Sequence, residues 1–283
     1  ATPGIYTLSL RDALRTFGTS EPNEGRVAVP DPRLETIAKI GGSQKIIETQ
    51  LAFVDIAGLV RGASKGEGLG NQFLANIRET DAIVHVLRCF EDDDITHVEG
   101  KVDPIADAET VETELMLADL ESLEKRVPNL LKKGAQGDKE AKAAASVLGQ
   151  TLELLRDGKP ARLTQPRDDE EARLFAQAQL LTAKPVLYVC NVEEGAAAQG
   201  NAHSARVFDK AAAENASAVI VSAAIEAELV TMPVEERGEY LEALGLTEAG
   251  LARIIRAGYE LLGLITFFTV GPKIGRASCR ERV

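Results

Sequence analysis

The residues best suited to chemistry lie after short apolar runs in this sequence. Asp55 ends the apolar run 51–54, and Gly58 follows it in a D-x-x-G pattern. An acid at the end of a buried strand can hold Mg²⁺, usually through water, and a glycine amide can approach a phosphate because no Cβ blocks it. D-x-x-G alone is often only turn chemistry. The glycine-rich stretch 58–70 costs entropy in a plain connection, so it indicates a mobile functional segment and strengthens the interpretation.

A second group of polar residues follows two later apolar runs. Asn191 and Glu194 form N-x-x-E after the run 185–190, and Ser222 with Ala223 follows the run 218–221. Ligands of open α/β sheets bind at the carboxyl ends of the strands, which is where these residues are expected. Many guanine-binding sites place Asp where Glu194 stands. The longer side chain of Glu would intrude on the guanine edge, which favours adenine or a relaxed preference.

These residues need strands and helices to position them. Apolar runs alternate with helical patterns, which predicts a mostly parallel sheet covered on both faces. The predicted strands are 51–55, 82–89, 185–191 and 218–222, and the predicted helices are 71–80, 202–214 and 248–262.

The block 108–182 interrupts this alternation, because it contains no strand pattern. Two long charged amphipathic helices are predicted at 112–133 and 138–156, and Asp138 is the expected N-cap of the second. A shorter helix is predicted at 169–181. The sequence therefore predicts an α/β domain into which a helical hairpin is inserted.

Composition excludes several classes of protein. The 283 residues include 44 acids and 32 bases, a formal net charge of −12, which argues against a generic nucleic-acid surface and against a DNA partner. No apolar run approaches the roughly 20 residues needed to cross a bilayer, and no signal segment is present, so we expect a cytoplasmic protein with no membrane partner. None of the three cysteines forms a C-x-x-C, which argues against structural zinc. We expect His85, Cys89 and Cys190 to be buried strand residues.

Both ends of the chain differ from the rest in their amino-acid pattern. Residues 274–283 are abruptly basic, lack an apolar period and resemble the translation of a sequencing-library adapter; residues 1–16 have a similar character. We interpret both segments as non-native and leave them out of the functional argument. The sequence also contains no G-x-x-x-x-G-K-[ST] motif, which is the phosphate-binding loop (P-loop) of many nucleoside triphosphatases.

Together, the motif segments resemble the YchF family of Obg-like ATPases. The resemblance extends from about residue 17 to about residue 273, and the glycine-rich block and the N-x-x-E are its most specific parts. The segments that carry it are 53–60, 70–82, 88–95, 256–259 and 267–269.

The resemblance implies a fold in several parts. A P-loop NTPase domain of the Ras-like (G domain) type would comprise 17–107 and 183–273, interrupted by a coiled-coil helical hairpin at 108–182. By comparison with the family, the first strand with its P-loop and a C-terminal TGS domain are expected to be missing from this sequence.

The resemblance also implies roles for residues near the phosphates. Thr19 in switch I and Asp55 would hold Mg²⁺, and Gly58 would contact the γ-phosphate. Leu59 stands where Ras-like enzymes usually have a water-orienting Gln, so hydrolysis is expected to be slow.

The base pocket is implied in the same way, with Asn191, Val192 and Glu194 lining it and Ser222 and Ala223 supporting it. The implied function is slow, Mg²⁺-dependent hydrolysis of ATP, with GTP less favoured, by a translation-related or stress-related factor that contacts the ribosome or ribosomal RNA. Activity of this chain is expected to be impaired because the P-loop is absent. The alternative is a non-hydrolysing module that docks a ribosome or protein partner through its helical hairpin.

Overall fold

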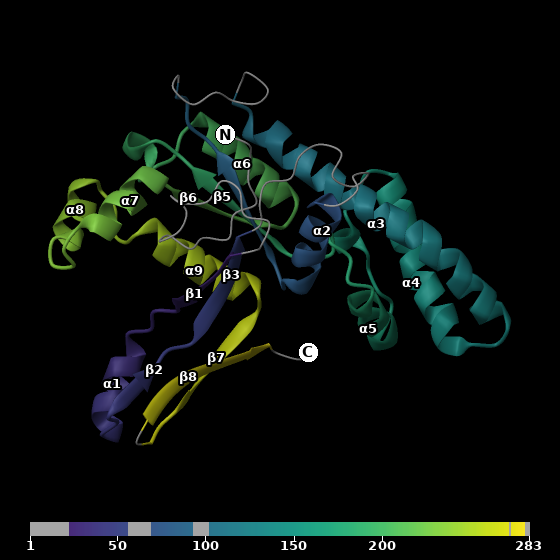
Figure 1. Cartoon of the computed structure of the whole chain (residues 1–283), viewed down its shortest axis with the longest axis horizontal. Helices are drawn as coiled ribbons and strands as arrows, with labels where there is room; N and C mark the ends of the chain where they lie inside the picture. Colours follow the sequence, from purple (N-terminus) through teal and green to yellow (C-terminus); the bar gives the residue numbers. More distant parts are fainter. Residues whose placement is uncertain (1–22, 56–68, 93–101, 272, 281–283) are drawn as a thin grey trace. The chain divides into compact units, whose positions relative to one another are not determined.

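The computed structural model describes residues 23–55, 69–92, 102–271 and 273–280 (Figure 1). The chain divides into two compact units, each of which is described by itself. The first comprises Ala1–Gly58, Val84–Ile105 and Val186–Val283, and the second comprises Leu59–Ile83 and Ala106–Pro185. Among the helices of the described residues, none is long and apolar enough to cross a bilayer.

A parallel sheet lies at the centre of the first unit. Its strands are β4 (Ile83–Arg88), β5 (Val186–Asn191) and β6 (Ser217–Val221), in the order β4-β5-β6. β5 and β6 pair in parallel. β4 and β5 are also parallel, because the hydrogen bonds from Ile83 N to Pro185 O (2.9 Å) and from Cys89 N to Asn191 O (2.8 Å) advance in the same direction along both strands. All residues of β5 but the last are buried, as expected for a parallel strand covered on both faces.

Helices α6 (Ala202–Ala213) and α9 (Gly250–Leu261) pack against β5 and β6. η3 (Glu194–Ala196) precedes α6 in sequence, and α7 (Ala223–Thr231) and α8 (Arg237–Ala243) lie between α6 and α9. The Gly250 amide at the start of α9 donates a 2.6 Å hydrogen bond to Glu226 Oε1 on α7. Only glycine fits there, because a Cβ would come within 2.8 Å of Val221 Cγ1. The start of α9 is thereby held against the end of β6.

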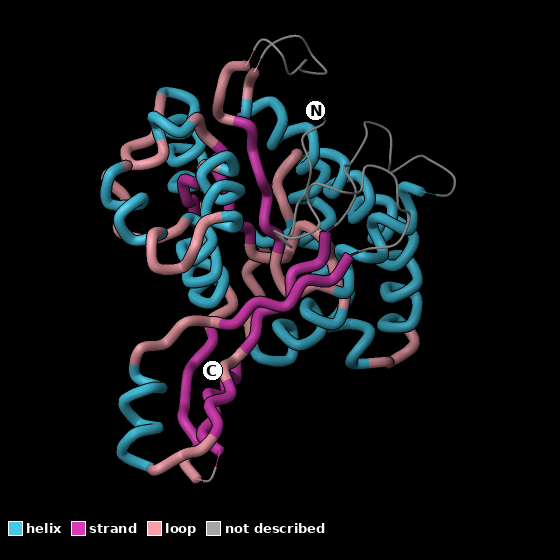
Figure 2. Tube along the Cα trace, turned by 60° about the vertical axis from the view of Figure 1, so that its left-hand side comes forward, coloured by secondary structure: helices cyan, strands magenta, loops and turns pink. Residues whose placement is uncertain are grey.

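The remaining strands form two further sheets. β1 (Asn23–Ala28) pairs antiparallel with β3 (Gln50–Asp55), and β8 (Lys273–Arg280) lies between β2 (Lys45–Ile47) and β7 (Leu264–Thr269). Helix α1 (Arg33–Gly41) packs against β8 in this last sheet, whose magenta strands lie near the C-terminus in Figure 2. β8 includes residues 274–280 of the segment 274–283, which we interpreted from its sequence as non-native.

One expectation about the sheet is wrong for the described residues. We expected a single, mostly parallel sheet, whereas three sheets are present and only β4-β5-β6 is wholly parallel. The reason is that, among the strands that the structure describes, β3 pairs only with β1 and β4 only with β5, so β3 and β4 share no hydrogen bonds.

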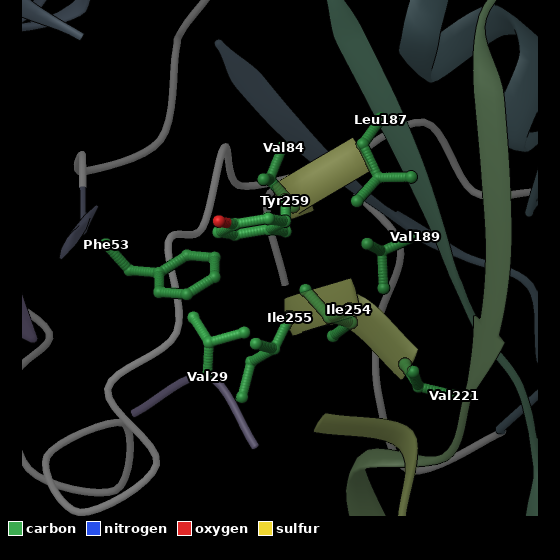
Figure 3. Packing of buried hydrophobic residues seen from close by; sticks show 9 residues of the cluster. All are labelled: Val29, Phe53, Val84, Leu187, Val189, Val221, Ile254, Ile255 and Tyr259. Atoms are coloured by element: carbon green, nitrogen blue, oxygen red, sulfur yellow. The ribbon is translucent and has the colours of Figure 1, made fainter. Parts of the chain in front are cut away.

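Side-chain packing joins β3 to the β4-β5-β6 sheet. Phe53 of β3, Val84 of β4 and Ile254 of α9 belong to one apolar core, and Figure 3 shows their side chains converging. Burying a large apolar side chain contributes about 1.5–3 kcal/mol, so this cluster accounts for much of the stability of the unit. Its buried members are Val29, Phe53, Val84, Leu187, Val189, Val221, Ile254, Ile255 and Tyr259.

The second unit is helical in its described residues. It contains α2 (Leu69–Glu79), nearly all of α3 (Pro104–Ala135), α4 (Lys139–Arg156), the 3₁₀ turn η2 (Ala161–Leu163) and α5 (Asp169–Gln177). The Asp138 N-cap is confirmed, since its carboxylate accepts from Ala141 N at 3.0 Å. α3 begins at Pro104, earlier than the predicted 112, because proline suits the first turn of a helix.

Asp119 of α3 joins the hairpin to the segment that leads into β5. Its buried carboxylate accepts hydrogen bonds from Leu181 N (2.9 Å), Thr182 N (2.8 Å) and Thr182 Oγ1 (2.7 Å). Burial raises the pKa of Asp119, while these donors oppose the rise. The carboxylate thus satisfies main-chain groups that would otherwise be buried without partners.

Candidate functional site

Asp55 is the last residue of β3 and provides one end of the candidate site. Its Oδ1 atom is buried and has no hydrogen-bond partner among the described residues, and burial raises the pKa of its carboxyl group. Buried polar atoms are normally hydrogen-bonded, so this carboxylate oxygen is a candidate to bind a ligand. A hard oxygen donor of this kind fits Mg²⁺, which binds through one or two carboxylates with water and phosphate oxygens completing its shell.

Asn191 ends β5 and ties two loops together. Its side-chain Oδ1 accepts from Ala223 N at 2.9 Å, while its main-chain O accepts from Cys89 N at 2.8 Å. The next residue, Val192, is buried and donates its amide to Val221 O at 2.9 Å. The start of the N-x-x-E segment is therefore fixed to both neighbouring strands. The Asn191 Nδ2 group donates to no described residue, which leaves it available to a ligand.

Ser222 stands at the end of β6 and is the N-cap residue of α7. Its side chain is only 3% exposed, yet it makes no capping hydrogen bond and its Oγ has no partner. Ala223, the next residue, is exposed and carries the amide bound by Asn191. The Ala223 amide is already used by Asn191, so the Ser222 hydroxyl is the group of this loop that can donate to, or accept from, a polar ring.

Asn201 is a positioning residue that the sequence reasoning missed. Its Nδ2 donates to Cys89 O (2.6 Å) at the end of β4 and to Glu193 Oε2 (2.9 Å) beside Glu194. Asn201 also forms a capping box with Ser204 at the start of α6. The N-x-x-S pattern before a predicted helix was the available signal. Asn201 thus connects three elements around the N-x-x-E loop.

The structure brings some of the predicted site residues together. Asn191, Val192, Ser222 and Ala223 meet at the ends of β5 and β6, with Glu194 exposed at the start of η3. Asp55 lies at the end of β3 in the same unit. The remaining predicted residues, Thr19, Gly58 and Leu59, lie outside the described residues. Within the described part of the chain, no cluster of three or more His, Cys, Asp or Glu could hold a metal.

Comparison with known proteins shows which fold the chain has and to which family it belongs. A family model described as "50S ribosome-binding GTPase" matches residues 15–125, a range that includes β1 to β4 and Asp55. The solved structure of the Schizosaccharomyces pombe YchF GTPase superposes with a TM-score of 0.79 at 32% identity, covering 99% of this chain and 75% of that one. The fold is therefore that of the P-loop GTPases.

Sequence relatives define the family more closely. The chain is 51% identical over 261 residues to the ribosome-binding ATPase YchF of Haemophilus influenzae, covering 92% of this chain and 71% of the relative. It is 48% identical over 263 residues to the protein of the same name in Bacillus subtilis, covering 92% and 72%. The chain belongs to the YchF family, as its motifs indicated.

Proposed function

We propose that this chain is a ribosome-associated, nucleotide-binding protein of the cytoplasm that hydrolyses ATP slowly, with GTP less favoured, as a translation-related or stress-related factor. The observation that carries the proposal is the site at the strand ends: the Asn191–Ala223 hydrogen bond beside the orphaned Ser222 Oγ, with the orphaned Asp55 Oδ1 on β3. The names of the relatives, ribosome-binding ATPases, support the ATP and ribosome components.

The base would lie against the loops that follow β5 and β6. Asn191 Nδ2 and the Ser222 hydroxyl would hydrogen-bond the ring, and Val192 would support the pocket from the buried side. In a guanine site, the shorter carboxylate of Asp accepts from the guanine N–H groups. Glu194 extends one methylene further and would intrude on that edge, which is the physical reason to expect ATP to bind better than GTP.

The phosphates would lie toward the end of β3. Asp55 and Thr19 would hold Mg²⁺, which when bound neutralises charge on the phosphate oxygens. Gly58 would donate its amide to the γ-phosphate. Leu59 has no polar group with which to orient water, so slow hydrolysis is expected. Because the sequence has no P-loop motif, we expect weak nucleotide affinity from this chain alone.

Equilibrium binding of fluorescent ATP and GTP tests the proposal. The titrations use Mg²⁺, this chain, and a version preceded by a family-type strand and P-loop; an Asn191→Ala variant of the longer version serves as a site control. We expect the longer version to bind ATP more tightly than GTP, and Asn191→Ala to weaken both. If neither version binds while both give folded circular-dichroism spectra, the assignment of nucleotide binding is wrong.

A second candidate function is a non-hydrolysing module that docks a ribosome through the helical hairpin. The observation that favours it is the end of α3, where Leu131 is 57% exposed and is followed by exposed Lys132 and Lys133. Co-sedimentation with ribosomes tests it. Lys132→Glu with Lys133→Glu should abolish the association at low salt, while the exchange of exposed Lys159 for Glu should leave it. Equal co-sedimentation of the two variants would remove the hairpin as the docking element.

A further inference from the structure

The outer edge of β6 has no neighbouring strand among the described residues. β6 ends the order β4-β5-β6. Val221 O accepts from Val192 N of the segment that continues β5, so Val221 and Val219 direct their main-chain groups toward β5. Main-chain direction alternates along a parallel strand, so the N–H and C=O groups of Ala218 and Ile220 face outward. These groups form a template for a further strand.

An open hollow of about 330 Å³ lies along this edge. On one face Phe208 of α6 contributes a ring that is 40% exposed, and on the other Arg253 and Arg256 of α9 contribute guanidinium groups. Successive side chains of β6 point to opposite faces of the sheet. Val219 packs against the core that contains Ile254 of α9, and Ile220 lies near Gly200, just before α6. One side of the hollow is therefore apolar and the other charged.

The hollow is lined by two arginines and two glutamates, and one arginine donor has no acceptor among the described residues. Arg256 donates to Glu248 from both terminal nitrogens, and Glu260 acts electrostatically on the same guanidinium, so both acids of the hollow interact with Arg256. Arg253 Nε is buried and has no hydrogen-bond partner among the described residues. A buried donor without an acceptor is destabilising, so a carboxylate supplied by a partner would be favourable here.

We propose that the β6 edge and this hollow bind an extended, acidic segment of a protein partner. The segment adds as a strand to β6, pairing with the outward groups of Ala218 and Ile220, and its side chains alternate between the two faces. Apolar side chains contact Phe208, and a carboxylate accepts from Arg253. A second copy of this chain fits less well, because β6 contains no acid and a symmetric pair would bring two Arg253 side chains without a free carboxylate. The proposal is independent of nucleotide binding.

Fluorescence anisotropy with designed peptides tests whether the bound segment must be acidic and must pair as a strand. The probe is a labelled peptide of sequence TVDVDVT. The matched controls are TVKVKVT and a TVDVDVT peptide that is N-methylated on alternate amides, so that its main chain cannot donate hydrogen bonds to β6. We expect the acidic peptide to bind about tenfold or more tightly than either control, since one control lacks the carboxylates and the other lacks the main-chain donors. Equal binding of the acidic and basic peptides, or no binding of any peptide at millimolar concentration, would overturn the proposal.

Two variants locate the binding to this edge. Arg253→Gln should remove the preference for the acidic peptide. Ala218→Pro deletes an outward amide without removing a bond to β5, so it should weaken binding of every peptide while the sheet persists. Arg173→Gln, at an exposed arginine of α5, is the control and should bind as the parent does. Circular dichroism and thermal unfolding verify that each variant is folded. If the proline variant instead dissociates a dimer of this chain, a second copy is the occupant and the peptide proposal is overturned.

Discussion

Two buried oxygen atoms, Asp55 Oδ1 and Ser222 Oγ, lack partners at strand ends where the sequence placed a ligand. Both atoms belong to residues that the sequence motifs predict to contact a ligand. Their chemistry differs, since a carboxylate suits a cation and a hydroxyl suits a polar ring. At the residue scale, these two groups lie where the proposed site has its two ends, Asp55 at the phosphate end and Ser222 at the base end.

Glu194→Asp tests the account of base preference. In the version that carries a P-loop, shortening this side chain should lower the ratio of ATP affinity to GTP affinity by about tenfold, because the carboxylate no longer occupies the guanine edge. Paired titrations with fluorescent ATP and GTP measure the ratio. Glu235→Asp changes an exposed glutamate away from the loop and should leave the ratio as it is. An unchanged ratio in Glu194→Asp would contradict the account.

His85 makes stability depend on pH. The ring is 4% exposed, its Nε2 has no partner, and burial together with the nearby Lys210 charge lowers the pKa of His85 to about 4. The unfolded chain, with a pKa of about 6.5, therefore takes up this proton first, and stability is lost as the pH falls from about 6.5 toward about 4. At pH 5 the loss amounts to about 2 kcal/mol.

His85→Leu should remove this dependence. Urea unfolding at pH 7 and pH 5 measures it, and the free energy of unfolding should fall by about 2 kcal/mol less in the variant than in the parent. His203→Leu, at a histidine near the start of α6, is the control and should retain the parent's dependence. A variant that loses as much stability as the parent would show that other groups determine the pH response.

At the scale of elements, one buried carboxylate links α3 to the segment that follows α5 in the same unit. Asp119 on α3 accepts two main-chain amides and one hydroxyl from residues 181 and 182. Those donors are buried, so they have no water to replace the carboxylate. Asp119 therefore adds a polar link to the apolar core that α3 shares with Ala178 and Leu180.

Asp119→Ala should lower the free energy of unfolding by about 2–4 kcal/mol, because two buried amides lose their acceptor. Asp169→Ala removes an exposed acid in the first turn of α5 and should cost less than about 1 kcal/mol, its effect on the helix dipole. Urea denaturation followed by circular dichroism compares the two variants. Equal losses would mean that the Asp119 hydrogen bonds contribute little.

For the molecule as a whole, the described sheets of the first unit depend on side chains for their cohesion. Phe53 from β3 enters the same core as strands β4 to β6 and helix α9, although β3 forms no hydrogen bonds with those strands (Figure 3). Phe53→Ala should lower the free energy of unfolding by about 3–5 kcal/mol. Phe267→Ala, at a ring that is 48% exposed, should cost far less, and similar losses in thermal or urea unfolding would contradict this view of the core.

Local sequence patterns predicted the elements that carry the site. The predicted strands 51–55, 82–89, 185–191 and 218–222 are confirmed to within a residue or two as β3, β4, β5 and β6, and the predicted helices 202–214 and 248–262 as α6 and α9. His85, Cys89 and Cys190 are buried as expected. These predictions succeeded because continuous apolar runs and capping residues act over a few neighbouring positions.

The sequence by itself determined where the site-bearing strands end and which polar residues follow them, and its motifs identified the family. Only the tertiary structure revealed the Asn201 links, the carboxylate connection of Asp119, the open edge of β6 and the division into three sheets. β1, β2, β7 and β8 were not predicted. β1 and β8 have no clear apolar pattern. They become strands by pairing with β3 and with β7 and β2, and such pairing depends on hydrogen-bonding partners that are remote in sequence.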